Sequence, residues 1–388
     1  MPTLTGLDRL YTAWPSALNN ARVGLLCHPA SVNRSLQHAI DIFKNFKKIK
    51  LTALFGPQHG IWGNTQDNMI EWQGFRDKKT GLPVYSLYGK YRKPTPAMLK
   101  QIDVLVIDLQ DVGARYYTFI WTMYLCLEAC LELKLPVIIL DRPNPINGQT
   151  VEGPLLDPAF ASFVGLQPLP IRHGMTIGEI ARYFQKYFFP QLSLTIILLK
   201  NWKRNYFFNQ TGLPWVLPSP NLPTLDAALL YPGLCLLEGT NLSEGRGTTK
   251  PFQILGAPFI DPDVLVHELN KNSLPGIFLR PLFFQPAFQK YTGKICGGAE
   301  IHILKAQSLK PVLTAAAILK TVRKLYPRRF AWRQPPYEYE TRQLPIDILA
   351  GSDRFREQLH QPLSWLAKDW SRQYLKFEKI RKSCLLYH

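Results

Sequence analysis

Four short apolar runs in the first half of the chain each end in a group of polar residues. The runs cover residues 22–27, 51–55, 103–107 and 136–140, and segments with helical periodicity separate them. Strand-length apolar runs that alternate with helices predict a parallel sheet. Because such sheets bind ligands at the carboxyl ends of their strands, we expect the polar residues after these runs to surround a ligand site.

The polar residues that follow the four runs are the first candidates for this site. His28 follows the first run, and Gln58 and His59 follow the second within the segment GPQHG. The third and fourth runs are followed by Asp108, Gln110, Asp111, Arg115, Asp141, Arg142, Asn144 and Asn147.

Further periodicity predicts the rest of the architecture. A capping box of Thr176 and Glu179 marks the start of one helix. Roughly the last 150 residues, with their glycine-rich polar stretch over 238–258 and separate helices, are typical of a smaller α+β unit. We expect an α/β domain with a parallel sheet over residues 1–230 and a smaller C-terminal α+β domain over 231–388, with a cleft between them. Helices are expected over residues 36–46, 118–133, 175–188, 313–326 and 365–377, and another strand over 192–199.

The composition fits a globular chain with a basic surface. The chain has 388 residues, of which 46% are hydrophobic, and its net charge is +18. Such a charge attracts polyanions, but the sequence has no RNA-module signature, zinc finger or long basic helix. We interpret the charge as a solvated surface, or as a basic cleft for a small carboxylate-bearing substrate, and we expect no nucleic-acid partner.

The cysteines and the N-terminus bear on location. Most of the six cysteines lie in apolar runs without metal-site spacing, which favours buried free thiols and a reducing compartment. We find no basic n-region followed by an apolar stretch, and no apolar run of about 18 residues. We therefore expect a cytoplasmic protein without a membrane span. A periplasmic or exported protein is expected only if the N-terminus is truncated.

Several common chemistries lack their motifs in this chain. No G-x-G-x-x-G follows the first strand, and neither a P-loop nor a G-x-S-x-G elbow occurs. Carboxylates and histidines at strand ends remain, joined by Glu152, Glu238 and Glu244. Two carboxylates that face each other across a sugar ring serve glycoside hydrolysis, provided that one has a raised pKa. A metal held by Asp108, Asp111 and either His59 or His173 is a weaker alternative, because the spacing is not compact.

Long ordered blocks resemble the exo-β-N-acetylmuramidases, the bacterial glycoside hydrolase family 171. The resemblance covers nearly the whole chain and implies a Rossmann-like α/β domain plus a smaller C-terminal domain, with the active site in the cleft between them. It implies removal of N-acetylmuramic acid (MurNAc) from the non-reducing ends of peptidoglycan fragments, without a metal or organic cofactor. The blocks are LFGPQHG, IDVLVIDLQDVGARYYT, LDRPNPINGQTVEGP, PIRHGMTIGEIA, TGLPWVLPSPNLPT, YPGLCLLEGTNLSEGRGTTKPF, GAPFID, PYEYE and IDILAGSD.

One position departs from the family pattern. The family carries its favoured catalytic glutamate in a G-P-E-H-G block, where this chain has Gln58. A glutamine side chain cannot serve as a general acid or base near neutral pH. Three consequences are open. Another carboxylate takes over, Gln58 orients a water molecule or the acetamido group, or the protein binds such sugars without cleaving them efficiently. The candidate replacement carboxylates are Asp67, Glu71, Asp111 and Glu244.

We therefore expect a glycosidase that acts on MurNAc-containing fragments in cell-wall turnover or recycling. The alternative is a non-catalytic or altered-specificity paralogue that binds muropeptides or amino sugars. The expected catalytic group is Gln58, His59, Asp111 and Glu244, and no metal ligands are expected. The expected substrate-binding residues are Asp67, Glu71, Arg115, Asp141, Arg142, Asn144, Glu152, His173 and Arg246.

Some of these residues also have structural interpretations. An ion pair of Asp141 and Arg142 would brace a loop, and Glu179 would serve only as a helix cap. Trp62 and Trp72, in the polar loop after the second strand, would either stack on a sugar or pack the loop itself. The substrate's lactyl carboxylate suits arginine partners. The candidate arginine partners are Arg115, Arg142, Arg172 and Arg246.

Overall fold

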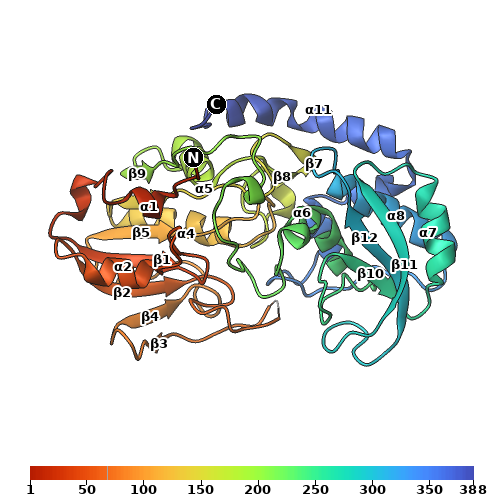
Figure 1. Ribbon diagram of the computed structural model, residues 1–388, viewed down its shortest axis with the longest axis horizontal. Coiled ribbons are helices and arrows are strands. Elements are labelled where there is room, and N and C mark those ends of the chain that lie inside the picture. Colours follow the sequence, from red (N-terminus) through yellow and green to blue (C-terminus); the bar gives the residue numbers. More distant parts are fainter. Residues whose placement is uncertain (68) are drawn as a thin grey trace.

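A seven-stranded sheet forms the centre of the first half of the molecule (Figure 1). The computed structural model describes residues 1–67 and 69–388. The strand order is β3-β4-β2-β1-β5-β6-β9, and every neighbouring pair is parallel except β3 and β4. The strands are β1 (Arg22–Cys27), β2 (Lys50–Gly56), β3 (Phe75–Arg76), β4 (Pro83–Ser86), β5 (Val104–Asp108), β6 (Val137–Leu140) and β9 (Leu194–Ile197). The predicted parallel sheet is thus confirmed.

Side chains that alternate along the strands pack on two opposite faces of this sheet. In β5, Leu105 and Ile107 join one buried cluster, whereas Val104 and Val106 join another. A parallel sheet covered on both faces requires such continuous apolar strands. The helices of the first half are α1 (Gly6–Arg9), α2 (Ala39–Asn45), α3 (Pro96–Leu99), α4 (Phe119–Glu132) and α5 (Ile177–Tyr187). Helices α1 and α2 pack on one face, and α4 and α5 on the other.

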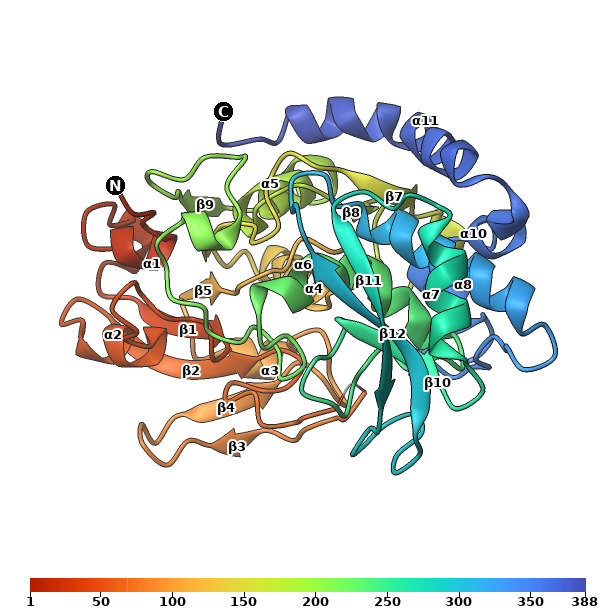
Figure 2. The same ribbon diagram turned by 45° about the vertical axis from the view of Figure 1, so that its right-hand side comes forward.

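The second half is built on a smaller antiparallel sheet with helices around it (Figure 2). Its strands are β10 (Ile254–Ala257), β11 (Ile277–Phe284) and β12 (Cys296–Ile303), in the order β10-β12-β11. Its helices are α6 (Leu225–Leu234), α7 (Pro262–Asn270), α8 (Pro311–Leu325), α9 (Pro345–Ala350), α10 (Arg354–Glu357) and α11 (Leu363–Lys382). The expected fold class, an α/β domain with a smaller α+β domain, is confirmed. The expected boundary after residue 230 stays a prediction, and that residue lies within α6.

Short elements complete the chain. The two-stranded antiparallel sheet of β7 (Glu152–Leu155) and β8 (Pro170–Arg172) lies between the two larger sheets in the sequence and near α11 in space. The short 3₁₀ helices are η1 (Ser16–Leu18), η2 (Pro158–Phe160), η3 (Phe208–Gln210), η4 (Cys235–Gly239) and η5 (Gln358–His360).

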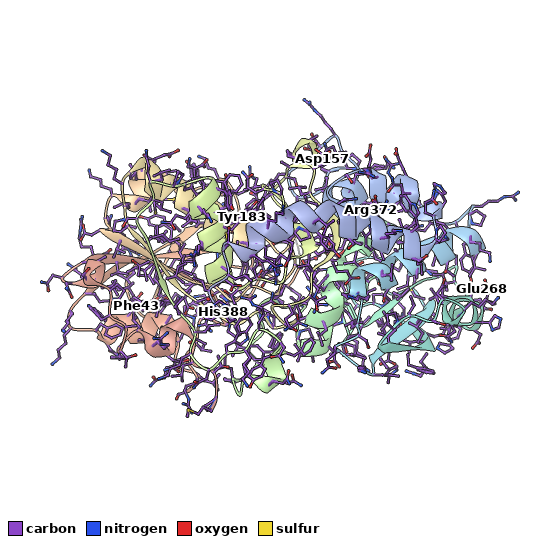
Figure 3. The ribbon with its side chains drawn as sticks, turned by 90° about the horizontal axis from the view of Figure 1, so that it is seen from above. Phe43, Asp157, Tyr183, Glu268, Arg372 and His388 are labelled. Atoms are coloured by element: carbon purple, nitrogen blue, oxygen red, sulfur yellow. The ribbon has the colours of Figure 1, made fainter. Side chains whose placement is uncertain are left out.

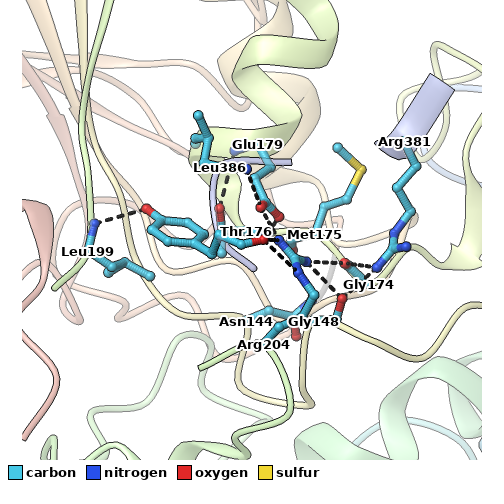
Figure 4. A network of polar contacts seen from close by, with 12 residues as sticks. Asn144, Gly148, Gly174, Met175, Thr176, Glu179, Leu199, Arg204, Arg381 and Leu386 are labelled. Carbon is cyan, nitrogen blue, oxygen red and sulfur yellow. Dashed lines mark hydrogen bonds and ion pairs between the residues drawn. The ribbon is translucent and has the colours of Figure 1, made fainter. Parts of the chain in front are cut away.

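Helix α11 runs over both halves, and the C-terminus returns to the first half (Figure 3). Tyr183 of α5 packs edge-on against Phe377 of α11, with ring centroids 6.2 Å apart. The last residues then bond to the start of α5, where the Leu386 N–H donates to Glu179 at 2.8 Å (Figure 4). Glu179 also accepts from the Thr176 N–H at 3.0 Å, so the predicted capping box is confirmed.

All six cysteines are free and buried, as the sequence predicts. Within residues 1–67 and 69–388, no helix is both long and apolar enough to cross a membrane.

Candidate active site

A buried pocket lies where the two halves meet. Its empty volume, with the solvent at its mouth included, is about 420 Å³. Both halves contribute to its walls, through the loop after β2, the segment before α4 and several loops of the second half. The lining residues are Gln58, His59, Tyr116, Tyr117, Thr118, Val164, Ser219, Leu222, Tyr231, Glu238, Arg246, Phe252, Tyr337 and Glu338.

Gln58 enters this pocket from the loop that follows β2. The Thr118 hydroxyl donates to Gln58 Oε1 at 2.7 Å. The Gln58 side chain also lies near the carboxyl group of Glu338 and lowers its pKa through a hydrogen-bonding interaction. Because the amide oxygen already accepts from Thr118, the amide N–H is the group of Gln58 that is available to Glu338.

Glu338 is a buried carboxylic acid at the wall of the pocket, with only 4% of its surface exposed. The Tyr88 hydroxyl donates to Glu338 Oε2 at 2.9 Å. Burial raises the pKa of the Glu338 carboxyl to about 7, although the hydrogen bonds from Tyr88 and Gln58 oppose this rise. A substantial fraction of Glu338 therefore carries a proton near neutral pH, as a general acid requires.

Glu238, the second acid of the lining, is held in the opposite state. Burial alone would raise its pKa, but the charge and hydrogen bond of Arg246 and the hydrogen bond of Tyr337 lower it below the ordinary value. Arg246 Nη2 donates to Glu238 Oε1 at 2.8 Å, and the Tyr337 hydroxyl donates to Oε2 at 2.8 Å. Two carboxyl groups of one pocket thus have pKa values driven apart, which is the pattern of an acid and a carboxylate in paired catalytic roles.

Arg246 is the cation of the pocket. Its Nε lies 3.4 Å from Glu244, and Lys290 also pairs with Glu244 at 3.0 Å. The guanidinium lies over the Phe252 ring, 5.0 Å from its centroid. Its Nη1 is buried and has no hydrogen-bond partner among the described residues. An arginine that is fixed by two carboxylates and keeps a free donor fits an anionic group of a ligand.

His59 lies beside Gln58 and is electrically neutral. Its Nδ1 is 2.8 Å from the Thr65 carbonyl oxygen, and its Nε2 is 3.2 Å from the Ser219 hydroxyl. Burial lowers the pKa of His59 to about 4. A carbonyl oxygen only accepts, so Nδ1 carries the proton and Nε2 accepts from Ser219. His59 therefore joins the loop after β2 to the wall of the pocket.

The backbone around the pocket is strained. The lining residues His59, Phe252 and Glu338 have φ values of +69°, +61° and +45°, and Tyr339 follows at +71°. Side chains other than glycine rarely adopt these values, which cost about 1–3 kcal/mol each and cluster at functional sites. The strain therefore agrees with a functional pocket at this place.

The other predicted catalytic residues lie near the pocket without lining it. Glu244 pairs with Arg246 Nε but is not part of the pocket lining. Asp111 accepts from the Gly113 N–H at 2.7 Å and lies 3.2 Å from His173 Nε2. Asp111 Oδ1 is buried without a partner among the described residues. Asp67 accepts from Gln289, which ties the loop after β2 to the second half, and Glu71 is exposed.

Three predicted substrate-binding residues form contacts at the sheet edge, and their role in substrate binding stays a prediction. Arg142 forms a buried two-bond ion pair with Asp108, at 2.6 and 2.8 Å. Asp141 accepts from the Gly178 N–H at 2.7 Å and the Thr176 hydroxyl at 2.9 Å, and burial raises its pKa to about 7. Asn144 donates to the Met175 carbonyl oxygen at 2.9 Å. The ion pair that braces this loop therefore joins Arg142 to Asp108 rather than to Asp141.

Arg115 and Glu152 connect the two halves. The Arg115 guanidinium is fully buried and donates to the carbonyl oxygens of Leu169 and Leu349, both at 2.7 Å. Glu152 accepts from the Leu313 N–H at 2.9 Å and thereby caps the start of α8. Both side chains bond to backbone groups and not to the pocket.

Two further sequence hypotheses can be placed. Trp72 packs within its own loop and donates to the Pro57 carbonyl oxygen at 3.0 Å, whereas Trp62 is 47% exposed. Within the described residues, no group of three or more His, Cys, Asp and Glu side chains is arranged to hold a metal ion. Asp108 and His59, two residues of the alternative metal site, bond to other partners.

Glu338 is the residue that the sequence reasoning does not find. It lies 280 positions after Gln58, in a turn-rich segment without helical or strand periodicity. The available signal is the block PYEYE, which places two glutamates and two tyrosines in a short segment. Glu238 lies in the glycine-rich stretch that the sequence does single out.

Comparisons with known proteins identify close relatives. Two adjacent family models match, described as exo-beta-N-acetylmuramidase NamZ, N-terminal, over residues 23–226, and exo-beta-N-acetylmuramidase NamZ, C-terminal, over residues 229–387. The peptidoglycan beta-N-acetylmuramidase NamZ of Bacillus subtilis (strain 168) is 44% identical over 385 residues, which are 99% of this chain and 91% of the relative.

Two crystal structures are also similar, both of DUF1343 family proteins from Bacteroides fragilis. One has a TM-score of 0.90 and 35% identity, and the other has a TM-score of 0.77 and 31% identity. Each comparison covers 100% of this chain and 99% of the other.

Proposed function

The chain belongs to the exo-beta-N-acetylmuramidase NamZ family, and we propose that its pocket releases MurNAc from the non-reducing end of peptidoglycan fragments. The protein is a glycosidase. The observation that carries this function is a pocket between the two halves that holds a protonatable carboxyl group, an ionised carboxylate and an arginine with a free donor. Glycoside hydrolysis needs two such carboxyl groups in different protonation states.

The pocket also suits the sugar that distinguishes this substrate. MurNAc carries a lactyl ether whose carboxylate is negative at neutral pH. We assign this carboxylate to Arg246, whose Nη1 is buried without a partner in the described part of the chain. A charge-assisted hydrogen bond in a buried site selects strongly for the group that completes it.

Aromatic side chains supply the apolar part of recognition. Tyr116, Tyr117, Tyr231 and Phe252 lie in the lining. Sugar rings present apolar faces that pack on aromatic rings, while polar groups fix the orientation of the ligand.

We propose that the protein works on peptidoglycan-derived saccharides in a reducing compartment such as the cytoplasm, where it serves recycling. Six free, buried cysteines support this location. The basic charge is assigned to a solvated surface, without a nucleic-acid partner. The proposed chemistry uses side chains of the pocket alone.

A chromogenic aryl β-MurNAc glycoside tests this function. We expect wild-type protein to release free MurNAc from it, and we expect Gln58→Glu to retain turnover because it restores the residue of the family block. Absence of product with both proteins would contradict the hydrolase function.

Gln58 itself favours a second candidate, a paralogue that binds muropeptides without cleaving them. Calorimetry with the disaccharide MurNAc-GlcNAc distinguishes the two functions. Heat of binding at an unchanged disaccharide concentration supports the binding protein, whereas disappearance of the disaccharide supports the enzyme.

A further inference from the structure

We propose that Glu338 is the catalytic residue that exchanges a proton with the glycosidic oxygen, and that Gln58 is a positioning residue that holds its carboxyl group. This inference rests on the proposed function and names the group that performs its proton transfer. It places the proton donor in the second half of the chain, on a segment far in sequence from the strand ends that form the rest of the site.

The first support is the position of the carboxyl group. Glu338 lines the pocket, and the Tyr88 hydroxyl, after β4, fixes its carboxyl group by a hydrogen bond, while Gln58, after β2, lies in the same pocket. The backbone is fixed as well, since Glu338 and Tyr339 both have positive φ values. A carboxyl group held from several sides in a strained turn has a defined geometry, which proton transfer requires.

The second support is the state of the other acids. Both oxygens of Glu238 are engaged, with Arg246 and with Tyr337, so Glu238 remains ionised and cannot donate a proton. Glu244 pairs with Arg246 and Lys290 and is not part of the lining. Asp67, Glu71 and Asp111 are also absent from the described lining of this pocket. Glu338 is therefore the acid of the lining that can carry a proton.

The third support is the presence of Glu338 and Gln58 in the same pocket. The resemblance implies a glutamate at position 58, and here Gln58 lies in the same pocket as the Glu338 carboxyl group, whose pKa it lowers. An amide cannot exchange the proton, but it can orient a carboxyl group that does. The pocket therefore holds an acid close to Gln58.

The charges and titratable groups around Glu338 agree with this role. The groups that act on it are Tyr88, Glu238 and Arg246, together with the amide of Gln58. Tyr337 and Tyr339 flank it on its own segment, and Tyr339 in turn responds to Glu71 and Arg92. Burial and the negative charge of Glu238 raise the pKa of Glu338, whereas Arg246 and the two hydrogen bonds lower it, and the balance is about 7.

The proposed step is a balanced hydrolysis. The protonated Glu338 carboxyl gives its proton to the glycosidic oxygen while the bond from C1 of MurNAc to that oxygen breaks. The bonding electron pair leaves with the oxygen, which becomes a hydroxyl group of the remaining saccharide. One water molecule adds its oxygen to C1 and releases a proton, which returns to Glu338 directly or through solvent. The net change consumes one water molecule and leaves the enzyme unaltered.

The experiment compares Glu338→Gln with the matched control Glu340→Gln. Glu340 belongs to the same segment, and its carboxylate accepts from the backbone N–H groups of Thr341 and Arg342, which a glutamine oxygen can also do. Each protein is assayed for kcat/KM with MurNAc-GlcNAc and with a 4-nitrophenyl β-MurNAc glycoside. Nitrophenolate can leave without being protonated. The sugar oxygen of the disaccharide is a poor leaving group and needs a proton from the enzyme.

We expect Glu338→Gln to lower kcat/KM for the disaccharide by about 10²–10⁴-fold and to lower it much less for the nitrophenyl glycoside. The alkaline limb of the wild-type pH profile, set by an acid with a pKa of about 7, should vanish in the variant. The control should stay within about threefold of wild type on both substrates. A merely structural role would lower both substrates equally and leave the pH profile unchanged.

The outcomes distinguish a failure of the Glu338 assignment from a failure of the proposed glycosidase function. If wild type cleaves both substrates and Glu338→Gln matches it, Glu338 is not the acid and the glycosidase function stands. If wild type cleaves neither, the function and this inference both fail. If Glu338→Gln does not fold, Tyr88→Phe serves instead. Loss of that hydrogen bond raises the pKa of Glu338, so the alkaline limb should move to higher pH, and an unmoved limb contradicts the inference.

Discussion

At position 58, a glutamine stands where the family block implies a glutamate, and its amide cannot exchange a proton. The sequence predicts that Gln58, His59 and Arg246 belong to the site, because strand ends and ordered blocks mark them. It does not predict Glu338, because the protonation state of that carboxyl group depends on burial and on neighbours from distant segments. Neither burial nor a long-range hydrogen bond leaves a local pattern in a sequence.

Substitution of Gln58 by glutamate tests the coupling between positions 58 and 338. Gln58→Glu removes an amide that lowers the pKa of Glu338 and adds a second ionisable acid beside it. Both effects favour the protonated form of Glu338. We expect the alkaline limb of kcat/KM to move up by about one pH unit or more, which a pH–rate profile measures. A limb that keeps its position, or moves down, contradicts the contact between the two side chains.

Arg246 allows a test of substrate recognition. Arg246→Lys keeps a positive charge between Glu238 and Glu244 but loses the second arm of the guanidinium. We expect KM for an aryl β-MurNAc glycoside to rise about tenfold to a hundredfold, the cost of one charge-assisted hydrogen bond. The matching β-GlcNAc glycoside has no lactyl carboxylate and should respond far less.

Arg280→Lys is the matched control for this variant, because Arg280 lies on β11 with 52% of its side chain exposed and pairs with Glu300 instead. If Arg246→Lys changes KM equally for the β-MurNAc and β-GlcNAc glycosides, Arg246 is not the partner of the lactyl carboxylate.

At the scale of elements, local signals predict some contacts and miss others. The capping box of α5 follows from the spacing of Thr176 and Glu179. The second oxygen of Glu179, however, accepts from Leu386 and Arg204, so the start of α5 is also the place where the C-terminus binds (Figure 4). The contact between Leu386 and Glu179 joins residues 207 positions apart, so no short-range sequence pattern predicts it.

Tyr387 anchors this C-terminal segment. Its hydroxyl group donates to Asp141 and accepts from the Leu199 N–H at 2.9 Å. We expect Tyr387→Phe to lower the free energy of unfolding by about 1–3 kcal/mol, because two buried polar groups lose a partner. Denaturant unfolding measures this loss, and hydrogen exchange should rise over residues 383–388.

Tyr11→Phe is the control for this change. Tyr11 is 68% exposed, and its substitution should alter the free energy of unfolding by less than about 0.5 kcal/mol. Equal stabilities of the two variants would contradict the anchoring role of Tyr387.

The start of α8 carries a pH-dependent contribution to stability. Burial raises the pKa of Glu152 to about 7 from its ordinary value of 4.5. Between these pH values the folded protein keeps a proton that the unfolded chain releases, so the contribution of Glu152 to stability falls as the pH rises towards 7. Glu152→Gln keeps an acceptor for the Leu313 N–H and removes this titration.

We therefore expect the Glu152→Gln protein to gain stability relative to wild type, on the order of 2 kcal/mol, as the pH rises from about 4.5 to about 7. Thermal or denaturant unfolding at both pH values measures the difference. The control Glu357→Gln changes a carboxylate that is 59% exposed and should follow the wild-type curve. Parallel curves for wild type and Glu152→Gln would contradict the raised pKa.

At the scale of the whole molecule, the two halves are closely joined. One buried cluster runs from the sheet of the first half, through Phe119 and Leu229, to α8 and α9 of the second. Helix α11 lies over both halves (Figures 1 and 2). The pocket draws its walls from each half, so its composition follows only from their packing.

The sequence predicts the parallel sheet well because buried parallel strands read as continuous apolar runs. It predicts the smaller α+β unit only as a class. Strands β10, β11 and β12 pair antiparallel around short, glycine-rich segments, and the register of such pairs depends on contacts beyond any short window.

Release of free MurNAc from MurNAc-GlcNAc, followed by mass spectrometry across about pH 5–9, tests the central claim most directly. The account predicts that the wild-type protein converts the disaccharide to its two sugars and that Glu338→Gln, folded to the same extent, leaves it intact on the same time scale. An intact disaccharide with wild-type protein at every pH, or equal conversion by the two proteins, would contradict it.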